Sequence, residues 1–173
     1  ALEMSGKKAQ AFTFLEKHVQ MHSNDIPSAM LLAERQIGKD RAAAIKTYEQ
    51  VLAKTPDNFV VLNNLAFLAL EDKKLTRAEE LAKKAVSLQR ENADAADTLA
   101  QIYIAKGDKA AALKLYEEVA ARPIANDDVY LNYVSVLLEL DKKALASRKL
   151  ASREFKSEAA KQRAESLKQQ YGL

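Results

Sequence analysis

The residues of this chain whose types and spacing could support chemistry are two histidines. His18 and His22 lie four positions apart, so a helix would place both imidazole rings on one face, as in a helical metal-binding pair. Glu16 is close in sequence, but no third ligand follows at a spacing typical of zinc sites. We therefore expect no metal at this pair.

Adjacent carboxylates occur twice, at Glu79–Glu80 and at Glu117–Glu118. Solvation of a helix surface explains both pairs. The chain has no cysteine, no glycine-rich phosphate loop, no nucleophile motif and no His–Asp arrangement of the kind that activates a serine. We therefore expect a protein that is not an enzyme and that uses no cofactor.

The composition favours a helical protein. The chain has 173 residues with only 4 glycines and 3 prolines, and alanine, the best helix former, is abundant. Its 27 basic and 24 acidic residues nearly balance, which argues against binding of nucleic acid by bulk charge. No apolar stretch reaches the length of a membrane span, so we expect no direct membrane insertion.

An internal repeat organises the chain. Four alanines recur every 34 residues: Ala44, Ala78, Ala112 and Ala146. Leu65–Ala66 and Leu99–Ala100 have the same spacing, whereas Leu32–Ala33 precedes them by one residue less, which places a missing residue near Gly38. The apolar spacing between these landmarks is helical. Each period is therefore predicted to form two antiparallel helices.

These motifs resemble the tetratricopeptide repeat (TPR). The resemblance rests on two stretches of the sequence: Gly107–Asp108, Ala112, Tyr116 and Val119 in one, and Asp40, Ala44, Tyr48, Val51 and Pro56–Asp57–Asn58 in the other. It implies one all-α domain over residues 1–173, a right-handed TPR superhelix of antiparallel helix pairs with a C-terminal capping helix.

The register divides the chain into units. Residues 5–24 are expected to form the second helix of a truncated repeat. Full repeats are expected at 25–58, 59–92 and 93–126, a degenerate repeat at 127–154 and an amphipathic capping helix at 155–173. Because repeat arrays rarely begin on an uncovered second helix, we interpret the chain as a fragment of a larger bacterial TPR protein.

The resemblance also implies a concave groove that binds a segment of a partner protein or a peptide. Carried over by register, the groove residues are Val60, Asn63, Asn64, Phe67, Asp94, Asp97, Thr98, Gln101, Leu131, Asn132 and Ser135. Asn64, Thr98 and Asn132 share one position, where an amide could bond a peptide backbone or could merely solvate the groove. Asp94, Asp97 and Asp128 would repel the anionic tails that some TPR co-chaperones bind.

The C-terminal segment is locally basic, which has two readings. Its cations could attract an anionic partner, or they could solubilise a helix that caps the repeats. No aromatic residues are interleaved on the polar face as stacking platforms, so we favour the capping helix and expect no nucleic acid partner.

A weaker resemblance suggests a second function. Asn63–Asn64–Leu65–Ala66, followed one period later by Asp97–Thr98–Leu99–Ala100, is similar to the closing repeats of bacterial TPR proteins of exopolysaccharide and PEP-CTERM systems. It implies a component of envelope polysaccharide synthesis or export that contacts glycan or the export machinery. The expected location is then periplasmic or associated with the outer membrane; a cytoplasmic location and the oligomeric state stay open.

Overall fold

The computed structural model describes the backbone of residues 2–173 and the side chains of residues 7 and 9–173. This part of the chain forms ten helices and no strands, and 77% of the chain is helical. The helices are α1 (Leu2–Met21), α2 (Ile26–Ile37), α3 (Arg41–Lys54), α4 (Phe59–Glu71), α5 (Leu75–Leu88), α6 (Ala93–Ala105), α7 (Lys109–Val119), α8 (Asp127–Glu139), α9 (Lys143–Ala151) and α10 (Glu158–Tyr171).

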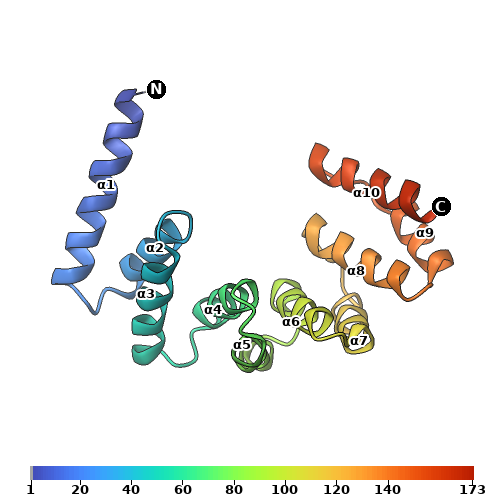
Figure 1. Ribbon diagram of the computed structural model, residues 1–173, viewed down its shortest axis with the longest axis horizontal. Helices are drawn as coiled ribbons and strands as arrows, with labels where there is room; N and C mark the ends of the chain where they lie inside the picture. Colours follow the sequence, from blue (N-terminus) through green and yellow to red (C-terminus); the bar gives the residue numbers. More distant parts are fainter. Residues whose placement is uncertain (1) are drawn as a thin grey trace.

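The helix pairs follow an open arc (Figure 1). After α1, which packs on α2, the helices pair as α2 with α3, α4 with α5, α6 with α7 and α8 with α9, while α10 packs on α8 and α9. In the arc α4 and α6 lie on the inner side, and α5 and α7 lie on the outer side. This arrangement confirms the predicted all-α repeat solenoid.

Polar residues at a fixed place in the repeat start the first helix of each pair. Asn58, Asn92 and Asn126 are the N-caps of α4, α6 and α8, and each side chain accepts a hydrogen bond from a backbone N–H of the first turn. Asp25 does the same for α2. These bonds satisfy donors that a helix start otherwise leaves unpaired, which explains their 34-residue recurrence.

The turns inside the pairs also repeat. Lys73, Gly107 and Asp141 each adopt a left-handed backbone conformation, with φ of 58°, 85° and 57°. The next residue closes each turn by donating a backbone hydrogen bond to a carbonyl five residues earlier, at 2.8–2.9 Å. The α2–α3 turn differs: Gly38 has φ −83° and α2 is one residue shorter than α4. The missing residue of the first repeat therefore lies at this junction.

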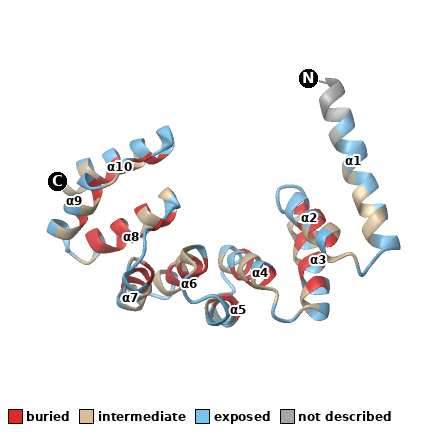
Figure 2. Ribbon diagram, turned by 180° about the vertical axis from the view of Figure 1, so that it is seen from behind, coloured by how far each residue is buried: buried red, intermediate tan, exposed pale blue. Residues whose placement is uncertain are grey.

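Small residues allow the helices of a pair to approach closely. The four alanines spaced by 34 residues are completely buried, with 0% exposure: Ala44, Ala78, Ala112 and Ala146. Tyr48 and Tyr116, two periods apart, are also completely buried and fill the space between units. Figure 2 shows that buried residues lie along every pair from α2 to α9. The core is therefore continuous along the arc.

The N-terminal helix differs from the expectation in its start. We expected Gly6 to precede the helix, but α1 begins at Leu2 and continues through Gly6. A glycine inside a helix costs about 1 kcal/mol relative to alanine, which the other residues of a long helix can offset. No helix in residues 2–173 has both the length and the apolar character needed to cross a membrane.

Candidate partner-binding faces

The eleven predicted groove residues lie on α4, α6 and α8. Nine of them reach solvent: Val60, Asn63, Asn64, Phe67, Asp94, Asp97, Gln101, Asn132 and Ser135. We call the surface of the first helices to which they belong the inner face. Thr98 and Leu131 are buried, with 7% and 0% of their surfaces exposed, and are packed among neighbouring helices. A partner on this surface therefore meets nine of the eleven residues.

Asn64 already has a partner within the chain. Its Nδ2 donates a hydrogen bond to the phenolic oxygen of Tyr48 on α3 at 2.9 Å. Burial raises the pKa of Tyr48, so this phenol stays neutral. The bond holds the amide against the preceding repeat and leaves its Oδ1 as the group that a peptide N–H could reach.

Asp97 is the centre of a polar network between α6, α7 and α8. Its Oδ1 accepts hydrogen bonds from Tyr116 at 2.5 Å and from Nδ2 of Asn132 at 2.8 Å, and its Oδ2 accepts one from Gln101 at 3.0 Å. Burial, and then the charge of Asp97, raise the pKa of Tyr116 well above its usual value. The network thus joins three predicted residues and fixes their orientation.

The capping helix contributes a residue to this surface that the sequence register missed. Arg163 on α10 donates to Oδ1 of Asn132 at 2.6 Å, and its guanidinium lies 3.7 Å from Asp128. Both ends of the Asn132 amide are therefore bonded inside the chain. No sequence signal identified Arg163, because α10 is outside the 34-residue register.

Two apolar residues of α2 extend the inner face toward the N-terminus. Leu31 and Ile37 are 43% and 38% exposed, unusually high values for large apolar side chains. Leu31 precedes Asn64 by 33 residues, the spacing that the shortened first repeat requires. The register therefore contained the signal for this position, although the predicted set began only at Val60.

Two carboxylates of the inner face lack ionic partners. Asp94 accepts a hydrogen bond from Nδ2 of Asn126 at 2.9 Å, and Asp97 accepts from the three neutral donors described above. Neither forms an ion pair with any residue whose side chain the structure describes. By contrast, Glu79 on α5 pairs with Lys106 and with Lys83, and these hydrogen bonds lower its pKa.

The histidine pair takes part in a helix junction. His18 Nε2 lies 2.8 Å from Oδ2 of Asp25, the N-cap of α2, and the His22 ring lies 4.7 Å from the His18 ring. Hydrogen bonds from Ser28 and then from His18 lower the pKa of Asp25 to about 2. Among the described residues, no three potential ligands gather around a common point.

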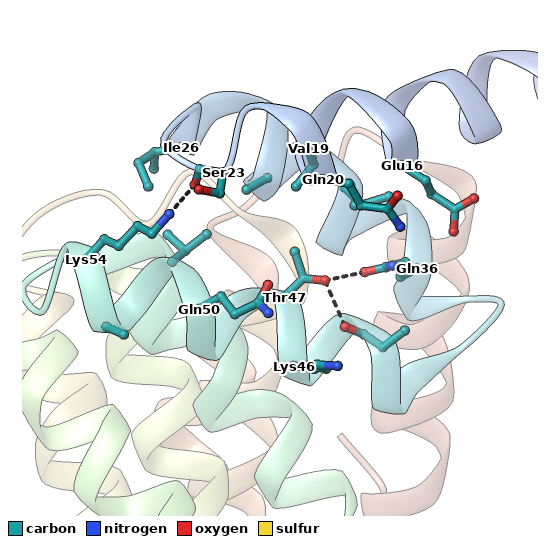
Figure 3. A pocket seen from close by; sticks show the side chains of 15 residues that line it. Glu16, Val19, Gln20, Ser23, Ile26, Gln36, Lys46, Thr47, Gln50 and Lys54 are labelled. Atoms are coloured by element: carbon teal, nitrogen blue, oxygen red, sulfur yellow. Dashed lines mark hydrogen bonds between the residues drawn. The ribbon is translucent and has the colours of Figure 1, made fainter.

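The best-formed pockets lie on the other side of the first helices. Each of the three largest is bordered by two successive second helices with the intervening first helix as its floor. The one between α1, α2 and α3 has a volume of about 620 Å³, roughly twice the others (Figure 3). At its floor Thr47 donates to Oε1 of Gln36 at 2.8 Å, and both side chains are buried. Sequence reasoning did not identify this pocket.

Comparison with known families agrees with the repeat. Two profiles described as tetratricopeptide repeat match the chain, one over residues 37–102 and the other over residues 92–122. Together they cover α3 to α7, the part of the arc with the most regular pairs. No curated protein matches the chain in sequence.

Solved structures extend the likeness to nearly the whole chain. The crystal structure of MamA superposes with a TM-score of 0.70 at 15% identity, covering 98% of this chain and 95% of that one. PilF of Pseudomonas aeruginosa gives a TM-score of 0.73 at 19% identity, covering 98% and 86%. MamA of Desulfovibrio magneticus RS-1 gives 0.71 at 14% identity, covering 86% and 84%. These identities support a shared fold.

Proposed function

Because this chain belongs to the tetratricopeptide repeat family, we propose that it is a non-catalytic scaffold that binds a segment of a partner protein on its inner face. The observation that supports this most is a row of exposed apolar side chains on adjacent first helices. Leu31 on α2 and Val60 and Phe67 on α4 are each more than 40% exposed. Large apolar side chains at such positions lose contact with water only when a partner covers them.

Polar groups beside this row suit an extended peptide. The free Oδ1 of Asn64 can accept from a backbone N–H, and the exposed carboxylate of Asp94 can accept from a backbone or side-chain donor. Such main-chain bonds provide affinity with little dependence on sequence, while the apolar residues select the side chains of the partner. The inner face offers both elements.

A glycan has less support as the partner. Sugar rings are usually bound against aromatic side chains, and among the nine exposed predicted positions only Phe67 is aromatic. The amides and carboxylates could bond hydroxyl groups, but two of them, Asn132 and Asp97, are already occupied by each other. We therefore place a peptide before a glycan.

A peptide selection tests the proposal. Random peptides displayed on phage would be selected against the complete chain, and their dissociation constants would be measured by fluorescence anisotropy. We expect Phe67→Ser to weaken the selected peptides about tenfold, since one buried apolar side chain contributes about 1.5–3 kcal/mol. Leu88→Ser is the matched control, because Leu88 is 41% exposed at the end of α5, on the outer side.

The opposite pattern would contradict the proposal. If Leu88→Ser weakened the peptides and Phe67→Ser did not, the binding surface would lie on the outer side. Failure to select any peptide that depends on Phe67 would equally count against the inner face. Thermal unfolding followed by circular dichroism would show that both variants are folded.

A further inference from the structure

The inner face has two chemically different halves, and this contrast identifies a class of partner. The half formed by α2 and α4 exposes Leu31, Val60 and Phe67, whereas the half formed by α6 exposes the carboxylates of Asp94 and Asp97. The inference drawn from the contrast rests on the proposed function, because it concerns the ligand of the same face.

The two halves correspond position by position. Val60 on α4 and Asp94 on α6 are one period apart, as are Asn63 and Asp97. Helices α4 and α6 contact each other directly. A segment that crosses from α4 to α6 therefore passes from apolar side chains to carboxylates over one interhelical distance.

The acidic half lacks internal neutralisation. Asp94 and Asp97 accept hydrogen bonds only from neutral donors among the described side chains, namely Asn126, Tyr116, Asn132 and Gln101. The nearby cation Arg163 is directed to Asn132 and Asp128. Carboxylates that lack a cation attract lysine or arginine from a partner, most strongly where a neighbouring apolar surface excludes water.

The alternative of an anionic partner conflicts with the same charges. A phosphorylated or acidic segment seated on Phe67 would place its negative groups against Asp94 or Asp97, and like charges at an interface oppose association. The net charge of +3 for the whole chain does not remove this local repulsion, because interactions are screened beyond about 8–10 Å at physiological salt.

We infer that the inner face binds an extended protein segment in which a large apolar residue is followed or preceded, about three residues away, by lysine or arginine. The spacing follows from geometry. Packed helices lie about 8–10 Å apart, and an extended chain advances about 3.3 Å per residue. The apolar side chain then covers Phe67 and Val60 on α4, and the cation reaches Asp94 on α6.

Synthetic peptides test this inference directly. One peptide would present leucine and, three residues on, arginine, within an otherwise Gly/Ser sequence; a second would replace the arginine with glutamate and a third with glutamine. We expect the arginine peptide to bind at least tenfold more tightly than the glutamate peptide, and its advantage over the glutamine peptide to shrink at high salt.

Variants of the protein supply the matched half of the test. Asp94→Asn removes the charge but keeps an oxygen for Asn126, so the fold is retained, and we expect about three- to tenfold weaker binding of the arginine peptide with no change for the glutamine peptide. Glu117→Gln on α7 is the control, because Glu117 is equally exposed but lies outside the inner face. It should leave both peptides unchanged.

The outcomes separate this inference from the proposed function. If peptides selected against the chain depend on Phe67 but are neutral or acidic, and Asp94→Asn leaves their affinity unchanged, the inference is overturned while inner-face binding stands. If no peptide depends on Phe67, the proposed function fails first. If the arginine and glutamate peptides bind equally, the charge argument is wrong.

Discussion

Arg163 on α10 donates a hydrogen bond to Oδ1 of Asn132 on α8 at 2.6 Å, while Nδ2 of the same amide donates to Asp97 on α6 at 2.8 Å. Asn132 therefore links the capping helix to two earlier repeats. An amide expected to bind a partner also holds together the C-terminal end of the arc.

Asn132→Ala should consequently lower the stability of the protein. The change removes two hydrogen bonds to charged groups, each worth about 1.5–3 kcal/mol. We expect a loss of about 2 kcal/mol or more, measured by urea unfolding followed by circular dichroism. Asn64→Ala, at the same register position, removes one bond to the neutral Tyr48 and should cost less, about 1 kcal/mol. Equal losses would contradict the network.

Glycine at two turn positions should stabilise the chain. Lys73 and Asp141 have φ of 58° and 57°, where Gly107 stands in the intervening repeat. A side chain in this conformation costs about 1–2 kcal/mol, and glycine avoids the cost. Lys73→Gly and Asp141→Gly should each raise the midpoint of thermal unfolding. Lys39→Gly, in the turn without a left-handed residue, should lower it; a rise there would contradict the explanation.

Asp127 should make stability depend on pH below neutrality. Arg153 donates from Nε to Asp127 Oδ1 at 2.9 Å, and this contact, followed by the Lys156 backbone N–H, lowers the pKa of the carboxyl. A lowered folded-state pKa stabilises the protein above the unfolded value of about 3.9, and the contribution disappears as the pH falls through the folded value. Urea unfolding between pH 5 and 3 should therefore show a steeper loss for the wild type than for Asp127→Asn. Parallel curves would refute this role.

Removing one buried oxygen should also stabilise the fold. Oδ1 of Asn63 is buried and accepts no hydrogen bond from the described residues. An unsatisfied buried acceptor costs about 1–3 kcal/mol, so Asn63→Leu, which is similar in size, should raise the thermal midpoint. Asn64→Leu is the contrasting variant, because it removes the bond to Tyr48 and should lower the midpoint. A lower midpoint for Asn63→Leu would show that the oxygen has a partner in solution.

The repeat architecture was predictable because its signals are local. The buried alanines Ala44, Ala78, Ala112 and Ala146 and the N-caps Asn58, Asn92 and Asn126 act within one helix or one turn, so their spacing appears directly in the chain. The same register located the first helices and their exposed positions. It could not show which of those positions are buried, as Thr98 and Leu131 are, because burial depends on neighbouring repeats.

The sequence by itself determined the 34-residue period, the helix pairs and the identity of most inner-face residues, since these follow from short-range spacing. Only the tertiary structure decided how those residues are engaged. Arg163 reaches Asn132 across 31 positions, and Tyr116 and Asn132 converge on Asp97 from two other helices. Such contacts depend on how one helix pair is rotated against the next, and that rotation is set by packing of side chains from several repeats at once.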